Sequence, residues 1–390
     1  MRALIIGGSV GGLAAACLLH RAGWEVAVFE RAAGDLAGRG AGLAVSAELV
    51  AIMERAGARF EASAAIVQPK LAWMAPDGRV LFEHPRQMVA SAWARIYQPL
   101  KAALPPRIYR RGMTLEHLEQ DERSVTAIFA GGARETADLL VAADGAHSTA
   151  RRQLAPQVEP RFADYVAWRG LVPERELPPA TLEALRGRIV FCFPPGEMLL
   201  CMAVPDGAYF IWYRGGGRPV RELFTDAQGR DHGMSIPPPL IRPEVVQALR
   251  REAGELLPGP VATVVERAAQ PLLQAISDME SARLVFGRVA LLGDAAFLVR
   301  PHVAGGASKA AIDAACLADA LARHPLPEAL AHYEARQRDF GSRLVRHSRY
   351  LGADLEGRPT ERDPRRIMRD YGAPQLLTEV PPERFASPPA

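Results

Sequence analysis

The chain reads GGSVGG at residues 7–12, between a short apolar run over 3–6 and an Ala/Leu-rich segment over 13–22. A second apolar run follows over 25–29. A strand, a glycine-rich turn, a helix and a second strand in this order predict a βαβ unit. We therefore expect residues 3–29 to form the first unit of a Rossmann-like parallel sheet.

Residues of this turn carry the expected binding chemistry. Gly7 permits the tight bend, Ser9 is small enough where the backbone approaches a pyrophosphate, and Gly12 lets helix and strand pack closely. The helix N-terminus offers free N–H groups and the positive end of its dipole to phosphates. Glu30, 18 residues after Gly12, is close to the usual spacing for an acid that binds ribose hydroxyls, and Arg31 beside it is a further candidate contact. The turn predicts a dinucleotide site, with NAD and FAD both open.

Composition excludes several other classes of protein. The 390 residues are 49% hydrophobic and 23% charged, as in ordinary soluble proteins, and the net charge of +3 comes without a Lys/Arg run that would form a nucleic-acid groove. No apolar run reaches the roughly 18 residues that a membrane helix needs. None of the four cysteines has metal-ligand spacing, and each lies in an apolar segment. We expect a cytoplasmic protein with buried free thiols and no metal, nucleic-acid or membrane partner.

Two further motifs decide between the cofactors. They read LLVAADGAHSTAR at 139–151 and GRVALLGDAAFLVRPHVAGGASK at 287–309. Taken singly, Asp144 and Asp294 are more simply explained as turn or helix-cap residues. Taken with the GGSVGG turn, in this order and spacing, the motifs resemble the fingerprints of the group A flavoprotein monooxygenases, the para-hydroxybenzoate hydroxylase family. The resemblance implies that the dinucleotide is FAD.

The resemblance also implies roles for individual residues. Asp294 would bind the ribityl chain of FAD, while Asp144 and Gly145 would support the flavin and the reduced nicotinamide. Ser148 and Arg151 complete the Asp-Gly motif.

The segment that precedes the predicted helix 308–323 would meet the pyrimidine edge of the flavin, where the helix dipole would stabilise the reduced, anionic ring. Its residues are Ala304, Gly305, Gly306 and Ala307. The chain departs from the commoner family pattern in having Phe297 in place of a His and Ala304 in place of a Gly. Tyr97 stands where an FAD-contacting Arg is frequent, and Arg95 nearby is the candidate that replaces it.

The order of elements predicts the fold class. We expect an α/β protein in which a Rossmann-like FAD-binding domain is interrupted by an antiparallel β-sheet substrate domain, with C-terminal helices. A hairpin with strands over 70–76 and 79–83, and four aromatic-rich strands within 165–213, belong to the substrate domain. We assign 1–69, 91–160 and 269–325 to the FAD-binding domain, 70–90 and 161–268 to the substrate domain, and 326–390 to a C-terminal helical region. The last 30 residues, rich in Pro and Arg, are expected to cover the surface.

Candidate substrate residues lie on the aromatic strands and in nearby loops. Side chains alternate along a strand, so Trp212 and Tyr213 cannot both face the pocket. Arg169 is expected either in the pocket or in a structural ion pair. Tyr209 and Tyr213 are candidates, as is His232, for which a surface loop is the stronger expectation.

Two residues are candidates for catalysis. His302 is nearest to the flavin along the sequence and would act as the partner of a ring hydroxyl or as a flavin-loop contact; the alternative is a loop histidine that only bonds backbone. Pro301 would lie against the flavin near C4a, as the family resemblance implies.

Three segments resemble the 2,6-dihydroxypyridine 3-hydroxylase branch of the family: YVAWRGLVP at 165–173, GMSIPPP at 233–239 and the loop at 300–302. The resemblance implies an NAD(P)H- and O₂-consuming monooxygenase that hydroxylates a small hydroxylated pyridine or phenol through a C4a-hydroperoxyflavin. The nicotinamide would bind transiently, as NADH or NADPH, because no second Rossmann motif is present. Oxidative decarboxylation, another oxygen insertion and, more remotely, a redox-sensing flavoprotein remain alternatives, and a homodimer is left open.

Overall fold

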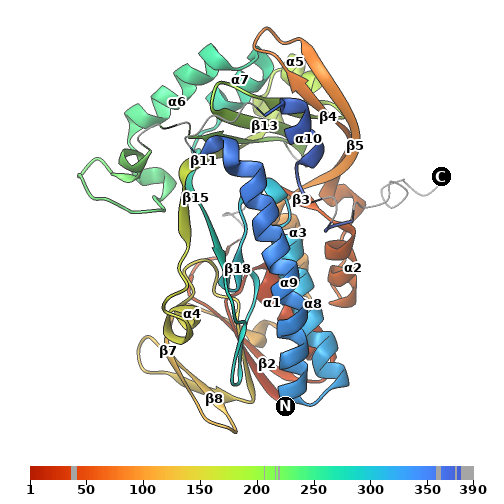
Figure 1. Cartoon of the computed structure of the whole chain (residues 1–390), viewed down its shortest axis with the longest axis vertical. Coiled ribbons are helices and arrows are strands. Elements are labelled where there is room, and N and C mark those ends of the chain that lie inside the picture. The colour runs from red at the N-terminus through yellow and green to blue at the C-terminus, as the bar shows by residue number, and fades with distance from the viewer. Residues whose placement is uncertain are drawn as a thin grey trace, which may run out of the picture.

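The structure is a computed structural model that describes residues 1–36, 42–205, 207–215, 217, 220–356, 362–373 and 376–378. A six-stranded sheet forms the lower half of the molecule in Figure 1, in the order β16-β17-β10-β1-β2-β6. All its neighbouring strands pair in parallel except β16 with β17. The strands are β1 (Arg2–Ile6), β2 (Glu25–Glu30), β6 (Tyr109–Arg111), β10 (Leu139–Ala142), β16 (Val285–Phe286) and β17 (Val289–Leu291).

Helices cover one face of this sheet. α8 (Gly306–Arg323) packs between α1 (Val10–Arg21) and α9 (Leu326–Gly352), and α2 (Ala47–Arg55) and α3 (Trp93–Ala102) lie against this group. A three-stranded sheet packs on the opposite side, where the rings of Phe29 and Phe129 have centroids 4.5 Å apart. Its strands are β7 (Leu115–Gln120), β8 (Val125–Phe129) and β9 (Arg134–Ala137), with α4 (Thr149–Leu154) beside β7. The predicted βαβ unit and parallel sheet are confirmed.

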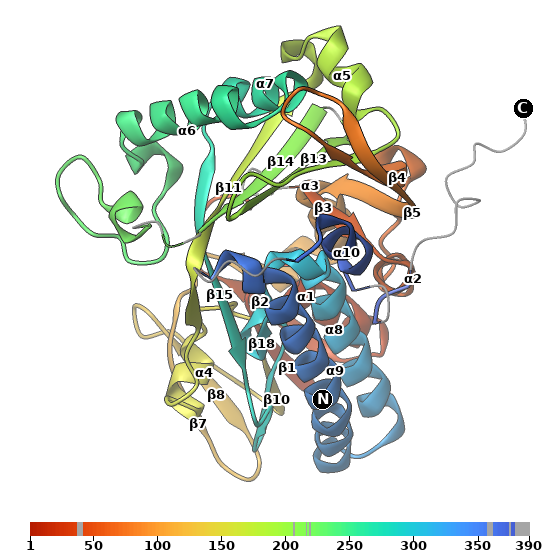
Figure 2. The same ribbon diagram turned by 45° about the horizontal axis from the view of Figure 1, so that its top comes forward.

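A nine-stranded sheet forms the other half, in the order β18-β15-β11-β14-β13-β12-β4-β5-β3. Its neighbours pair antiparallel except β12 with β4. The strands are β3 (Gly42–Val45), β4 (Ala65–Met74), β5 (Val80–Ala92), β11 (Arg161–Pro173), β12 (Ile189–Cys192), β13 (Glu197–Val204), β14 (Gly207–Arg214), β15 (Leu272–Glu280) and β18 (Phe297–Leu298). Figure 2 shows α6 (Pro243–Leu256) and α7 (Gly259–Arg267) along its outer face, with α5 (Pro179–Leu185) beyond them.

The extent of this sheet differs from the sequence expectation. The hairpin strands are longer than predicted, and both β3 and β15 join the sheet from segments that we assigned to the FAD-binding domain. β15 reads LLQAISDME, in which polar residues interrupt the apolar ones, so no continuous apolar run marks it as a strand. In the structure, β11 and β15 are long strands that run from one half of the molecule into the other (Figure 2).

The aromatic strands alternate as predicted. Phe210 and Trp212 of β14 pack into the core beneath α6 and α7, whereas Tyr209 and Tyr213 point to the opposite face of the sheet. That second face looks toward the parallel sheet, so the space between the two sheets is lined by tyrosines.

The expectation that the last 30 residues cover the surface needs correction. α10 (Pro364–Asp370) lies beside β4 and β5 rather than only on the surface (Figure 2), and Met368 and Tyr371 are buried in the core below the tyrosine face. Buried apolar partners hold this segment in place, although its Pro/Arg-rich composition predicts a surface covering. Residues 374–375 and 379–390 lie outside the described part of the chain. None of the helices that the structure describes combines the length and apolar character required to cross a bilayer.

Candidate active site

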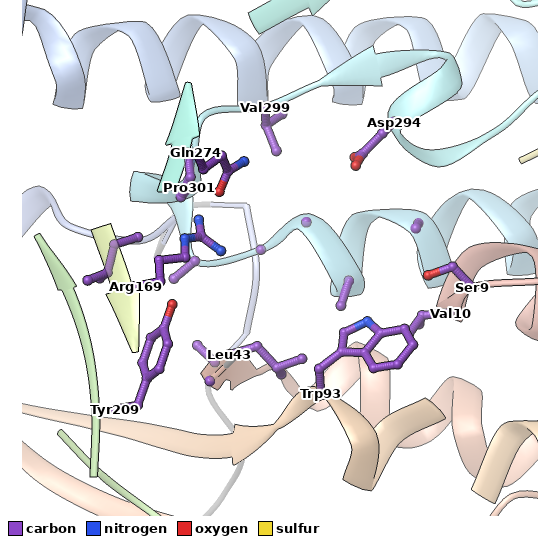
Figure 3. Close-up of a pocket in the computed structure, with 18 of the residues that line it drawn as sticks. Ser9, Val10, Leu43, Trp93, Arg169, Tyr209, Gln274, Asp294, Val299 and Pro301 are labelled. Carbon is purple, nitrogen blue, oxygen red and sulfur yellow. The ribbon is translucent and has the colours of Figure 1, made fainter. Parts of the chain in front are cut away.

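A cavity of about 540 Å³ lies between the two sheets, within the usual size range for a small-molecule site. Figure 3 shows its two ends: Ser9, Val10, Trp93 and Asp294 lie at one, Arg169 and Tyr209 at the other. Its wall includes many apolar side chains, among them Leu36, Leu43, Met88, Trp93, Ile189, Leu200, Met202, Ile211, Leu298 and Val299. One cavity therefore joins the predicted nucleotide turn to the predicted substrate sheet.

The GGSVGG turn has the shape needed for a phosphate. Gly7 has a φ of +104°, and a Cβ there would come within 2.2 Å of the Ala143 carbonyl oxygen. A Cβ on Gly12 would come within 1.9 Å of the Gly7 oxygen, so both positions require glycine. Ser9 precedes α1, lines the cavity and is exposed. Because the N–H of Leu13 donates to the Ser9 carbonyl, the three preceding N–H groups have no acceptor within the helix and can bind phosphate oxygens.

Glu30 lies beneath this turn rather than in the cavity wall. Its two carboxylate oxygens accept the N–H groups of Gly8 and Ala32 at 2.9 and 2.8 Å. A carboxylate has further lone pairs, so these bonds leave acceptor capacity for a ribose hydroxyl. The predicted contacts Arg31, which is exposed, and Arg95 are not among the residues that line the cavity.

Asp144 caps a helix, as the simpler explanation of the sequence expected. One carboxylate oxygen accepts the N–H groups of Thr149 and Ala150 at the start of α4, at 2.7 and 3.3 Å. The other is buried without a hydrogen-bond partner, and burial raises the pKa of this carboxyl group. Gly145 lines the cavity. An unpartnered buried oxygen beside the cavity fits a group that donates a hydrogen bond from a bound ligand.

Arg151 connects the Asp-Gly motif to the Gly-Asp motif. It is buried, and its guanidinium donates to the carbonyl oxygens of Ala146 and Val158 and, at 3.2 Å, to that of Ala295. Ser148 caps α4 by accepting the N–H of Arg151 at 2.9 Å. The structure therefore brings together the two motifs that are far apart in the sequence.

Asp294 projects into the cavity from the turn that follows β17 (Figure 3). Burial raises the pKa of its carboxyl group, and the nearby Lys309 ammonium opposes this rise. A carboxylate at the cofactor end of a largely apolar cavity fits the hydroxyl groups of a ribityl chain.

The loop before α8 supplies backbone to the cavity. Pro301, Ala304, Gly305, Gly306 and Ala307 all line it. Ala304 has a φ of +49°, in the left-handed region, which explains why the commoner family pattern has a glycine there. The N-terminus of α8 begins at this loop, so its free N–H groups and dipole are directed to the same space.

His302 does not line the cavity. Its side chain is fully buried; Nε2 lies 2.8 Å from the Tyr165 hydroxyl, and the ring packs on Tyr213 at 4.1 Å between centroids. Burial, and then the positive charges of Arg300 and Arg169, lower the pKa of His302 to about 3. The imidazole is therefore neutral at ordinary pH and lies behind the cavity wall.

Of the described residues that line the cavity, Arg169 of β11 is the one Lys or Arg, and it lies near Tyr209 at the substrate end. Its Nε is buried without a hydrogen-bond partner. Burial raises the pKa of Tyr209, and the charge of Arg169 opposes that rise. The structural ion pair that was the alternative for Arg169 is absent from the described residues.

Of the other predicted substrate residues, two line the cavity and one does not. Tyr209 and Tyr213 line the cavity, whereas His232 lies in a loop away from it and bonds Asp226 at 2.7 Å. Sequence reasoning missed Gln274, which alternation along β15 would have found, and Tyr371, for which the sequence offers no signal.

Comparisons with known proteins agree with this geometry. A family model described as FAD binding domain matches residues 1–348. The 2,6-dihydroxypyridine 3-monooxygenase of Paenarthrobacter nicotinovorans is 28% identical over 366 residues, with 91% of each chain covered. The 6-hydroxynicotinate 3-monooxygenase of Bordetella bronchiseptica is 27% identical over 375 residues, covering 89% of this chain and 90% of that protein.

A solved structure is also similar. The 2,6-dihydroxypyridine-3-hydroxylase from Arthrobacter nicotinovorans superposes with a TM-score of 0.87 at 28% identity, covering 100% of this chain and 98% of that chain. The expected α/β architecture and FAD as cofactor are thereby confirmed. The chain belongs to the FAD-binding domain family and is a flavin-dependent monooxygenase.

Proposed function

We propose that this monooxygenase hydroxylates a small aromatic ring that already carries a hydroxyl group, a hydroxypyridine or a phenol, with NAD(P)H and O₂ as co-substrates. The observation that carries the proposal is the continuous cavity, which starts at the α1 N-terminus and ends at Arg169. Relatives that cover nine-tenths of the chain act on 2,6-dihydroxypyridine and 6-hydroxynicotinate, as their names state.

The cofactor would be held along the nucleotide end of the cavity. The N–H groups at the start of α1 would bind the pyrophosphate, Glu30 a ribose and Asp294 the ribityl chain, while the N–H groups at Gly306 would face the flavin ring. Arg31, Arg95 and Asp144 remain predicted contacts. Bound FAD supplies electron transfer from NAD(P)H and the activation of O₂.

The protein would contribute to the reaction by positioning the ring systems, by supplying charge and by excluding water. The apolar wall keeps water from the reacting atoms, and Pro301 with the loop of residues 304–307 would hold the ring system in place. Arg169 would bind the oxyanion of the substrate, because an ionised hydroxyl makes the ring electron-rich and the guanidinium has no counter-charge within the described part of the chain. Tyr209 and Tyr213 would complete the polar contacts. His302 is proposed as support for the Tyr213 wall rather than as the base.

The deciding experiment is substrate-stimulated oxidation of NAD(P)H by the FAD-loaded protein. Addition of 2,6-dihydroxypyridine, 6-hydroxynicotinate or a phenol should accelerate NADH or NADPH consumption, with one oxygen atom from ¹⁸O₂ in the product. Release of CO₂ with product would instead favour oxidative decarboxylation. If no aromatic compound accelerates reduction of the flavin by NAD(P)H, a redox-sensing protein is the better explanation.

Two further expectations remain proposals beside this function. We place the protein in the cytoplasm, which fractionation of the source cells would test, and we leave the homodimer to analytical ultracentrifugation.

A further inference from the structure

One wall of the substrate end comes from outside the family match. Tyr371 lines the cavity, whereas the family model ends at residue 348. Tyr371 is 4% exposed, and its ring meets Phe191 of β12 edge-on, with 5.0 Å between centroids. The segment 362–373, here called the C-terminal strap, therefore closes a cavity that the family-matched part of the chain leaves incomplete.

The strap is anchored next to Tyr371 through main-chain atoms. The N–H of Gly372 donates to the carbonyl oxygen of His302 at 2.9 Å. The Arg86 guanidinium donates to the carbonyl oxygen of Tyr371, and Nε2 of His347 lies 2.7 Å from the carbonyl oxygen of Gly372. Three parts of the chain thus hold the strap: β5, the loop before α8 that contains His302, and α9. None of these contacts uses the Tyr371 side chain, so a different side chain at 371 keeps the same anchors.

We propose that Tyr371 is a specificity-determining residue that sets how large a ring system the substrate end accepts and keeps water out of it. The inference rests on the proposed hydroxylation and adds the residue that limits substrate size. The ring of Tyr371 belongs to the same buried cluster as Tyr209, Tyr213 and Phe191, so the substrate end is bounded by aromatic rings on the sheet side and by Tyr371 on the strap side.

The chemistry of the residue suits this position. A tyrosine adds a large rigid surface with two side-chain torsions, and its hydroxyl offers one polar contact to a substrate. Burial raises the pKa of the Tyr371 hydroxyl, so the group is neutral and donates rather than repelling an anion beside Arg169. Truncation to alanine would enlarge the cavity by most of a ring and admit water.

The test compares Tyr371→Ala and Tyr371→Phe with the wild-type FAD-loaded enzyme. The probes are 6-hydroxynicotinate, 2,6-dihydroxypyridine and hydroxyquinolines, which carry a second fused ring. We expect Tyr371→Ala to shift the ratio of kcat/KM for the fused over the single ring by about tenfold or more, ~1.4 kcal/mol. We also expect a larger share of the NAD(P)H consumed to appear as H₂O₂. Tyr371→Phe should retain the wild-type size preference.

Phe224→Ala is the matched control. Phe224 is as deeply buried but packs on the other face of the sheet, beneath α6 and α7, so its loss should reduce thermal stability without changing ring preference or H₂O₂ yield. If Tyr371→Ala keeps the wild-type ring-size preference while the wild-type enzyme hydroxylates a probe, the inference about Tyr371 is wrong and the proposed function stands. Absence of hydroxylation of any probe by the wild-type enzyme would instead contradict the proposed function.

Discussion

Lys309 donates a hydrogen bond from its ammonium group to the carbonyl oxygen of Gly293, at 2.9 Å, sixteen residues away in the sequence. The same ammonium bonds Asp313 at 2.6 Å, and that carboxylate oxygen accepts the N–H of Gly293 at 2.9 Å. Both side chains are buried, and Gly293 has a φ of +65°. Two of these hydrogen bonds hold Gly293, which directly precedes Asp294, and the third joins the two α8 side chains, so α8 sets the direction of the cofactor-side carboxylate.

Lys309→Met is expected to weaken FAD binding at least about tenfold, ~1.4 kcal/mol. The substitution removes the side-chain hydrogen bond to the Gly293 carbonyl and the ion pair of Asp313, and it removes the charge that opposes the raised pKa of Asp294. Protonation of Asp294 then sets in at higher pH, so the loss of affinity should grow as the pH falls. The release of flavin from the diluted holoenzyme, followed by its fluorescence at pH 8 and at pH 6, measures both effects.

Arg214→Met is the control for this prediction. Arg214 forms a buried ion pair with Glu197 in the nine-stranded sheet, away from the cavity. Breaking either pair should cost stability on the order of 3–5 kcal/mol, but only the Lys309 variant should release FAD faster. Equal flavin retention in the two variants would show that Lys309 serves folding alone.

The parts of the site that the sequence predicted are those whose chemistry is local. The GGSVGG turn requires glycine at Gly12 because a Cβ there would meet the carbonyl oxygen of Gly7 in the same βαβ unit, and at Gly7 because the turn itself imposes a positive φ. Ala304 could be recognised as unusual before its positive φ was known. Such requirements act between neighbours in the sequence or within one supersecondary unit, so a motif records them.

The parts that the sequence did not predict depend on contacts across the fold. His302 stands beside Pro301 in the chain, yet the turn directs it behind Tyr213 rather than into the cavity. Tyr371 reaches the cavity only because Arg86 and the loop at His302 hold the strap there. No periodicity or spacing records which surface a C-terminal segment will meet, since tertiary packing decides it.

Arg169→Met should weaken the binding of anionic aromatic ligands by about tenfold to a hundredfold, because it removes the positive charge that the described residues place at the substrate end. Perturbation of the flavin absorbance on titration with 6-hydroxynicotinate gives the dissociation constant without turnover. Comparison with 2,6-dihydroxypyridine separates recognition of a ring carboxylate from recognition of a ring oxyanion. Arg161→Met is the control, since Arg161 is an exposed residue of the same strand and its loss changes the net charge equally. If both variants bind both ligands as wild type does, Arg169 has no role in substrate binding.

The buried His302 should make the fold sensitive to mild acid. Its pKa is about 3 when folded and near 6.5 when unfolded, so between these values the unfolded chain binds one more proton than the native one. The associated stability is fully present above about pH 6.5 and is lost as the pH falls, by roughly 2 kcal/mol at pH 5. His302→Gln should show a correspondingly smaller drop in unfolding free energy between pH 7.5 and pH 5. A slope in His302→Gln identical to that of the wild type would contradict a neutral buried His302.

Ala304→Gly is expected to stabilise the protein, against the usual effect of an alanine-to-glycine change. A left-handed conformation costs a non-glycine residue roughly 1–2 kcal/mol, which exceeds the entropic cost of glycine at roughly 0.5–1 kcal/mol. The net gain should be about 0.5–1 kcal/mol in thermal or denaturant unfolding with FAD in excess, so that changes in cofactor occupancy do not contribute. Ala335 supplies the opposite case, because it is exposed in the middle of α9, where the same substitution should cost about 1 kcal/mol. Opposite signs for the two substitutions would locate backbone strain at the loop that leads into α8, whereas a loss of stability in both would mean that Ala304 is not strained.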